Sequence, residues 1–202
     1  NLAAESNDEI ERIKLLTSAL VASCQFQMNQ WKPFNPLLGE TYRCKYDEDT
    51  ELFLEHTSHH PAISNFYFTG KKWTCYGAFL YNGKVRPNTV SLFSETWSTL
   101  KFHDGRELKF NWPWLQMGNF LIGTRKISMI KLICVKSEDA KVKCIVKFNK
   151  EVKRKMMGLI TQTAYNECYG SIYIYDPIKE KKMIKKKFYD TISSLGKMVD
   201  VE

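Results

Sequence analysis

The segment Lys141-Val142-Lys143-Cys144-Ile145-Val146-Lys147-Phe148 shows the pattern from which the fold can be worked out. Its even-numbered residues are all apolar, and three of its four odd-numbered residues are lysines. Successive side chains of an extended chain point to opposite faces of a sheet. The segment therefore predicts a β-strand with one buried face and one face in water.

Similar short segments fill most of the chain on both sides of this strand. We predict strands at 51–56, 64–68, 73–80, 89–94, 97–102, 107–112, 119–122, 127–135 and 171–175. Turn-forming pieces separate them, such as Asn82-Gly83, His103-Asp104-Gly105 and Ser137-Glu138-Asp139. Consecutive short strands indicate antiparallel pairing within a β-rich region from about 41 to 190. Periodicity alone fits a sandwich and a barrel equally well, although closure of a barrel would remove exposed edges.

The first part of the chain has a helical period instead. Ser6 and Glu9 have the spacing of a capping box, and apolar or small residues follow at helical spacing: Ile10, Ile13, Thr17, Leu20, Val21 and Cys24. We predict one amphipathic helix over about 7–28. Pro33 and Pro36 then exclude a helix and predict an ordered loop before the first strand.

Length and composition predict one soluble domain. The chain has 202 residues, of which 44% are hydrophobic, enough for one sizeable core over 1–202. It has no apolar run of about 18 residues and no charged-then-apolar start, so we expect a cytoplasmic protein without a membrane span. The six cysteines include no C-x-x-C pair, so reduced, mostly buried thiols are expected rather than a zinc site.

The net charge of +8 favours anionic partners, either phospholipid headgroups or nucleic acid. The basic excess is concentrated in residues 178–187, which we expect to form a final strand or a short helix. A charge run is usually a solvated face, but a membrane contact is the alternative here. The candidate membrane-contact residues are Lys181, Lys182, Lys185, Lys186 and Lys187.

His59 and His60 are the residues most suited to binding chemistry. Neighbouring side chains of a strand diverge, so both can reach one ligand only at a strand end, which Pro61 makes plausible. Two imidazoles there could donate hydrogen bonds to one phosphate, whereas the plainer interpretation is a strand cap. No metal-ligand spacing surrounds them, no cofactor motif occurs, and Ser58 beside His59 lacks a nucleophile elbow. We therefore expect no metal, no cofactor and no enzyme, with a hydrolase as a distant alternative.

Nucleic acid is a minor option. Trp112-Pro113-Trp114 and the tyrosines near 165–175 could stack on bases. Aromatic side chains interleaved in alternating strands are more often core residues, so we expect no nucleic-acid partner.

Two segments together resemble a known family. These are Lys32-Pro33-Phe34-Asn35-Pro36-Leu37-Leu38-Gly39-Glu40-Thr41 and Glu55-His56-Thr57-Ser58-His59-His60-Pro61-Ala62. In this order and at this separation they are similar to the paired signatures of the oxysterol-binding-protein-related lipid-transfer family. The family pattern around the histidines is Glu-Gln-Val-Ser-His-His-Pro-Pro, from which this chain departs at His56, Thr57 and Ala62. Weaker resemblance extends over roughly 8–190.

The resemblance implies a mainly β fold, an incomplete antiparallel barrel around an apolar tunnel with an N-terminal amphipathic helix. It implies binding and non-vesicular transfer of phosphatidylinositol 4-phosphate, with possible exchange for a sterol or another phospholipid, at an anionic membrane surface that the protein visits transiently. The implied headgroup residues are Lys32, Asn35, Pro36, Leu37, Leu38, His59 and His60. The family's upstream lid and its C-terminal helical part are not expected in this chain. A membrane-tethered phosphoinositide sensor or scaffold without transfer activity is the alternative function.

Overall fold

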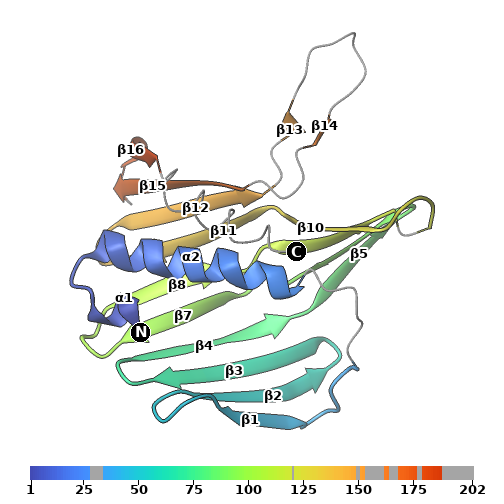
Figure 1. The fold of residues 1–202 in the computed structure, drawn as a ribbon, viewed down its shortest axis with the longest axis horizontal. Helices are drawn as coiled ribbons and strands as arrows, with labels where there is room; N and C mark the ends of the chain where they lie inside the picture. The colour runs from blue at the N-terminus through green and yellow to red at the C-terminus, as the bar shows by residue number, and fades with distance from the viewer. Residues whose placement is uncertain are drawn as a thin grey trace, which may run out of the picture.

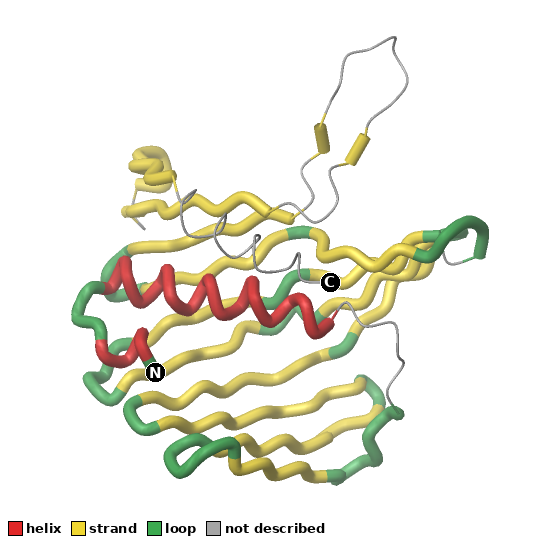
Figure 2. The backbone as a smooth tube through the Cα atoms, viewed as in Figure 1, coloured by secondary structure: helices red, strands yellow, loops and turns green. Residues whose placement is uncertain are grey.

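A computed structural model describes residues 1–27, 34–119, 121–148, 151–152, 162–163, 168–176 and 179–187. In 151–152, 162–163, 175–176 and 179–187 the description covers the backbone only. Most of the described chain is β-structure, with two helices at its start (Figures 1 and 2).

One large antiparallel sheet dominates the fold. Its ten strands follow the order β1-β2-β3-β4-β7-β8-β11-β12-β15-β16. Their bounds are β1 Thr41–Lys45, β2 Glu51–His59, β3 Ala62–Gly70, β4 Trp73–Leu80, β7 Trp97–Phe102, β8 Glu107–Asn111, β11 Leu132–Ser137, β12 Val142–Phe148, β15 Cys168–Asp176 and β16 Lys179–Lys187. β1 and β16 form opposite edges and do not pair, so the sheet stays open. The predicted mainly β, antiparallel, unclosed fold is confirmed.

A second sheet of four strands leaves the large one and projects beyond it (Figure 1). Its order is β10-β9-β6-β5, with bounds β5 Asn82–Arg86, β6 Thr89–Phe93, β9 Trp114–Gly118 and β10 Lys126–Ile130. We call residues 82–93 and 114–130 the arm. The short pair β13 Glu151–Val152 and β14 Gln162–Thr163 makes up the third sheet.

Two helices precede the sheets, α1 Leu2–Glu5 and α2 Glu9–Gln27. α2 lies against β11 and β12, and the side chains between the helix and these two strands form the centre of the core. The fully or nearly fully buried apolar residues include Ile13, Leu20 and Cys24 of the helix and Ile133, Val135, Val142, Cys144 and Val146 of the strands. The alternation of 142, 144 and 146 therefore does bury one face of β12, as predicted. Neither described helix is long and apolar enough to cross a bilayer.

The helix begins two residues later than a capping box at Ser6 requires, at Glu9 instead of residue 7. The Asp8 carboxylate accepts a hydrogen bond from the Ile10 N–H at 2.9 Å, and the Asp8 carbonyl accepts the first helical bond, from Arg12 N–H at 3.0 Å. Asp8 is thus the N-cap. Ser6 instead accepts a bond from the Asp8 N–H at 3.1 Å and shapes the turn that enters the helix.

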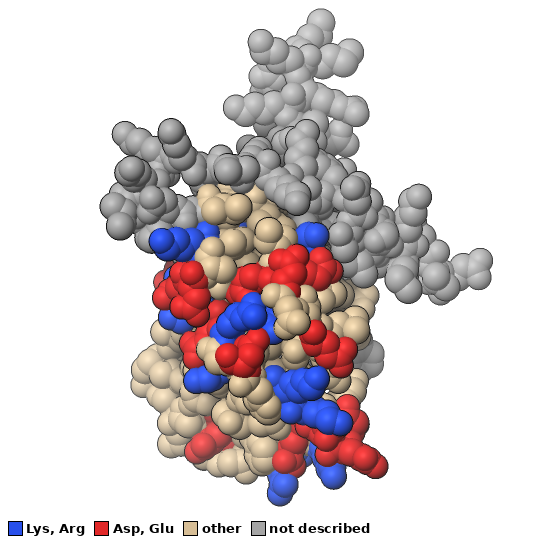
Figure 3. Space-filling view, turned by 90° about the vertical axis from the view of Figure 1, so that its left-hand side faces the viewer, with Lys and Arg blue, Asp and Glu red and all other residues tan. Residues whose placement is uncertain are grey.

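Ion pairs join the start of α2 to the turn between β7 and β8. Arg12, only 2% exposed, donates to Asp104 at 2.6 Å, and Arg106 lies 3.4 Å from Glu9. The hydrogen bond from Arg12 lowers the pKa of the Asp104 carboxyl. Acidic and basic side chains are intermixed over this end of the molecule (Figure 3).

Several strand predictions need correction. Asn82-Gly83 is not a turn but the start of β5, and β9 forms where no strand was predicted. Residues 119 and 121–123 form no strand, because the side chain of Asn88 takes the N–H groups of Leu121 and Ile122 that a strand would pair. The predicted strand 127–135 is two strands, since Lys131 has φ +72° between β10 and β11. The last basic segment, left open between helix and strand, is strand β16.

Candidate functional site

The two candidate histidines lie where a strand ends, as Pro61 predicts. His59 is the last residue of β2, Ala62 is the first of β3 and its partner, and a cis His60–Pro61 peptide lies in the turn between them. The rings of His59 and His60 are 4.9 Å apart, edge to face. The strand end therefore brings both imidazoles to one place.

A β-bulge adds a third histidine. His56 pairs with Ser64 but Ser58 pairs with Ile63, so Thr57 is the extra residue on β2. Residues three apart on a regular strand face opposite sides, whereas the bulge returns His59 to the side of His56. His56 Nε2 lies 3.2 Å from His59 Nδ1, and His56 Nδ1 lies 2.9 Å from Ser64 Oγ. We call His56, His59 and His60 the histidine cluster.

The three histidines of the cluster differ in their exposure to solvent. His56 is 4% exposed, whereas His59 and His60 are exposed. If His56 keeps its proton on Nδ1 and donates it to Ser64, its Nε2 accepts the Nδ1–H of His59. His59 then presents its outer nitrogen to a ligand and can hold a second proton when an anion arrives. In that tautomer the chain Ser64–His56–His59 orients one imidazole toward solvent, and the ring of His60 lies 4.9 Å from it.

Sequence reasoning treated His56 only as a departure from the family pattern. No periodicity reveals its role, because the bulge changes which residues share a face. Ser58, in contrast, follows the bulge directly and points to the face opposite His59. A Ser58–His59 nucleophilic pair is therefore not formed. The described part of the chain contains no group of three His, Cys, Asp or Glu side chains arranged to hold a metal ion.

The loop before β1 is fastened to the strand of the histidine cluster. Gly39 N–H donates to the His56 carbonyl at 2.8 Å, and His56 N–H donates to the Glu40 carbonyl at 3.0 Å. The Glu40 carboxylate accepts the Leu37 N–H at 2.7 Å, which closes the turn, and Gly39 has φ +79°, where a side chain would be strained. The loop is thus held beside the cluster by backbone bonds.

The structure places some of the predicted site residues and not others. Asn35, Pro36, Leu37 and Leu38 are exposed on this loop, next to the strand that carries the cluster. Lys32 lies outside the described residues. The predicted membrane-contact lysines at 181, 182, 185, 186 and 187 belong to β16, at the sheet edge opposite β1, and their side chains lie outside the description.

An apolar wall continues from the cluster along the same face of the sheet. Register places the following residues on the face of His56: Leu52, Leu54, Phe66, Phe68 and Phe79. The same row continues through Cys75, Leu100 and Leu108 to the face that α2 covers. The wall is only half-buried, because α2 lies over the far half of the sheet. Apolar surface of this kind suits acyl chains or a sterol.

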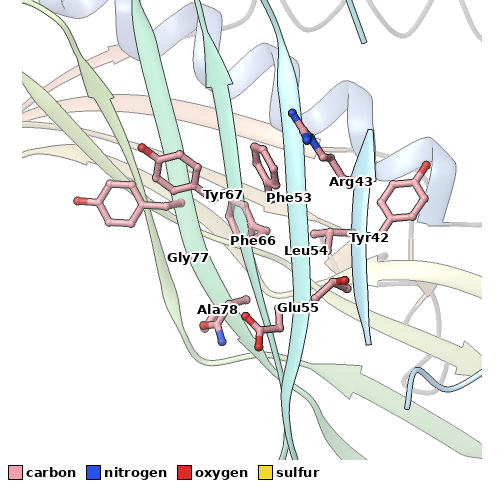
Figure 4. Close-up of a pocket in the computed structure, with 12 residues that line it drawn as sticks. Tyr42, Arg43, Phe53, Leu54, Glu55, Phe66, Tyr67, Gly77 and Ala78 are labelled. Carbon is pink, nitrogen blue, oxygen red and sulfur yellow. The ribbon is translucent and has the colours of Figure 1, made fainter. Parts of the chain in front are cut away.

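A hollow of about 790 Å³ lies over β1–β4 (Figure 4). Leu54 and Phe66 of the apolar wall are among the residues that line it. Tyr67 stacks on Tyr76 at 6.5 Å, and the Arg43 guanidinium lies 5.2 Å from the Phe53 ring. None of the histidine cluster lines this hollow. The histidine cluster and the hollow are therefore distinct features of the sheet.

Comparison with known proteins identifies relatives over most of the chain. The family model described as oxysterol-binding protein matches residues 1–192. Oxysterol-binding protein 9 of Dictyostelium discoideum is 32% identical over 149 residues, which are 73% of this chain and 35% of that protein. Human oxysterol-binding protein-related protein 8 is 31% identical over 117 residues, 52% of this chain and 13% of that protein. The chain thus spans about a third of the length of the Dictyostelium relative.

Crystal structures show the same fold at lower identity. The Osh1 ORD domain in complex with cholesterol has a TM-score of 0.73 at 24% identity, covering 86% of this chain and 40% of that one. The Osh3 ORD of Saccharomyces cerevisiae in complex with PI(4)P has a TM-score of 0.69 at 20% identity, covering 92% and 49%. At this identity the likeness establishes the fold alone.

Proposed function

The chain belongs to the oxysterol-binding protein family, and from this premise we propose that it binds a phosphoinositide and transfers it between membranes without catalysis. Phosphatidylinositol 4-phosphate is the proposed lipid, with a sterol or another phospholipid as a possible exchange partner. The observation that supports this best is the convergence of His59 and His60 at a strand end, with His56 behind them.

Phosphate recognition at the cluster follows from its donors. Imidazolium groups donate charge-assisted hydrogen bonds, each contributing about 1.5–3 kcal/mol. A bound phosphate favours the protonated imidazoles, so binding weakens as the pH rises. We propose that Lys32 adds an ammonium from the loop, and that Asn35 and the backbone of 36–38 line the inositol ring. The backbone bonds between Gly39, Glu40 and His56 support this arrangement, because they keep the loop in place before a ligand arrives.

The rest of the lipid lies on the apolar wall in this proposal. The half-buried wall shares a face with His56, so a lipid bound by its headgroup at the cluster can lay its chains along Leu54 and Phe66. The Osh1 complexes contain cholesterol or ergosterol and the Osh3 complex contains PI(4)P, which supports the choice of these two ligand classes. The protein would meet its donor and acceptor membranes peripherally, from the cytoplasm.

Extraction of labelled phosphatidylinositol 4-phosphate from liposomes tests this function. The double variant His59→Ala, His60→Ala loses at least two charge-assisted bonds, so its apparent affinity should fall at least about a hundredfold. His103→Ala is the matched control, because His103 is an exposed histidine in the turn between β7 and β8. Wild-type extraction should also decline as the pH is raised, because a neutral imidazole donates a weaker hydrogen bond to phosphate than an imidazolium does.

Two results would contradict the proposal in different ways. Equal extraction by wild type and the double variant would remove the histidine cluster from the site. Sedimentation with phosphoinositide vesicles without any extraction would instead favour the membrane-tethered sensor. Release of product from an ester substrate would point to the hydrolase.

A further inference from the structure

The tip of the arm exposes apolar side chains that the lipid site does not use. The tip consists of the end of β5 with the turn that follows it, residues 85–88, and of the described residues between β9 and β10, 119 and 121–125. Leu121 is 71% exposed, Ile122 79% and Val85 77%. A soluble protein rarely gathers such side chains at one projecting end unless they contact something.

A hydrogen-bond network around the half-buried side chain of Asn88 fixes the backbone that carries Leu121 and Ile122. The Asn88 side-chain oxygen accepts the N–H groups of Leu121 at 3.0 Å and Ile122 at 3.1 Å, and its amide donates to the Ile122 carbonyl at 3.1 Å. Asn119 in turn donates to the Thr124 carbonyl at 2.9 Å. Backbone groups left without partners are costly in lipid. At this tip, four backbone groups already have side-chain partners: the N–H groups of Leu121 and Ile122 and the carbonyls of Ile122 and Thr124. Moving these four groups out of water therefore costs less than it would for unpaired groups.

The charge of the arm selects the partner. Residues 82–93 and 114–130 contain four basic residues, Lys84, Arg86, Arg125 and Lys126, and no acidic residue. Register puts Arg86 and Lys126 in one row across the arm, through Thr89 and Gly118. The opposite end of the molecule mixes both signs (Figure 3). The charged residues of the arm are all basic, and its tip exposes apolar side chains. An anionic bilayer offers both complements, acidic headgroups for the basic residues and an apolar interior for Leu121 and Ile122.

The arm also starts beside the histidine cluster. Tyr81 N–H, one residue before β5, donates to the carbonyl of Ala62 at 3.0 Å, directly after the His60–Pro61 turn. β5 has five residues, so its far end lies about 17 Å from that point. In Figure 1 the arm projects from the side of the sheet at which β2 ends.

We propose that the arm tip docks the protein on an anionic bilayer by inserting Leu121 and Ile122 among the headgroups, with the basic residues of the arm against the acidic lipids. Docking at the arm tip holds the exposed side chains of His59 and His60 near the membrane surface. This role of docking rests on the proposed lipid-transfer function, whereas the docking itself does not.

Sedimentation with phosphatidylcholine/phosphatidylserine vesicles that contain no phosphoinositide tests the docking. The variant Leu121→Ser, Ile122→Ser should bind at least about tenfold more weakly, because two exposed apolar side chains no longer enter the bilayer. Tyr46→Ser is the matched control, an 81% exposed aromatic in the turn between β1 and β2. The variant Lys84→Glu, Arg86→Glu should also bind the vesicles more weakly. Added salt should reduce its binding less than it reduces wild-type binding, because fewer charge contacts remain to be screened. Equal thermal unfolding of all variants will show that they fold.

Vesicle binding by Leu121→Ser, Ile122→Ser at the wild-type level would overturn the inference. The inference would also be overturned if wild type self-associated through Leu121 and Ile122, so that the Leu121→Ser, Ile122→Ser variant became monomeric but bound vesicles as well as wild type does. The two proposals fail separately: the His59→Ala, His60→Ala variant should still bind these vesicles while losing extraction. If wild type extracted lipid without binding these vesicles, only the docking proposal would be wrong. If it bound the vesicles without extracting lipid, only the transfer proposal would be wrong.

Discussion

His56 is the least exposed member of the histidine cluster, and it touches both Ser64 and His59. Its Nε2 lies 3.2 Å from Nδ1 of His59, so in the proposed function it is a positioning residue that does not itself contact the ligand. His56→Leu should weaken lipid extraction about three- to tenfold, the worth of one hydrogen bond. It should also shift the pH profile of extraction, because the proton on His59 loses its acceptor.

His56→Gln provides the control for this substitution. An amide can accept from His59, and the family pattern has Gln at this position, so extraction should be largely restored. If Leu and Gln at position 56 gave the same affinity and the same pH profile, the orienting role would be wrong.

Part of this cluster could be foreseen from sequence. Pro61 predicts that a strand ends there, which is enough to bring His59 and His60 together. His56 could not be foreseen, because three residues separate it from His59 and regular alternation puts the two on opposite faces. The bulge at Thr57 reverses that parity, and nothing in the composition of the strand indicates it.

Among the elements, α2 shows how far a periodic pattern reaches. Ile13, Thr17, Leu20 and Cys24 are buried as predicted, while Ile10 and Val21 flank the core half-buried. The helix start was less predictable, because Ser6 and Asp8 are both good caps and only the geometry of the turn chooses between them.

The choice of cap can be measured. Asp8→Ala should lower the free energy of unfolding by about 1 kcal/mol, because the Ile10 N–H loses its acceptor. Ser6→Ala should cost less, since Ser6 shapes the preceding turn rather than capping the helix. Urea unfolding followed by circular dichroism compares the two variants; a larger loss for Ser6→Ala would restore the capping box.

The arm was the element least accessible to sequence. Asn82-Gly83 is typical of a hairpin turn, yet these residues pair with Leu92 and Phe93 as part of β5. The actual turn follows Arg86, and the loop after β9 depends on Asn88, about 33 residues away along the chain. Such long-range partners leave no local signature, so periodicity predicts strands here but not where they end.

For the molecule as a whole, alternation established antiparallel β-structure but left sandwich and barrel undecided. The resemblance to a family favoured an incomplete barrel, and the open sheet of ten strands agrees with it. The position of α2 on the sheet was beyond prediction. It depends on the row of buried side chains shared by β8, β11 and β12 and on ion pairs between residues far apart in sequence.

The Arg12–Asp104 pair should make this docking of α2 sensitive to acid. Asp104 has a pKa below its ordinary value in the folded protein, chiefly through its hydrogen bond from Arg12. Its contribution to stability is therefore complete above the unfolded pKa of about 4 and is lost as the pH falls through the lower folded value. Asp104→Asn should cost about 1 kcal/mol at pH 7, a modest figure because the carboxylate is 37% exposed. Urea unfolding from pH 7 to pH 2 measures the difference in free energy of unfolding between Asp104→Asn and wild type, which should disappear as the pH falls below about 4. The control Asp139→Asn, in the turn between β11 and β12, should differ little from wild type at any pH. A gap for Asp104→Asn that stays constant into acid would mean that the carboxylate's charge does not hold α2 to the sheet.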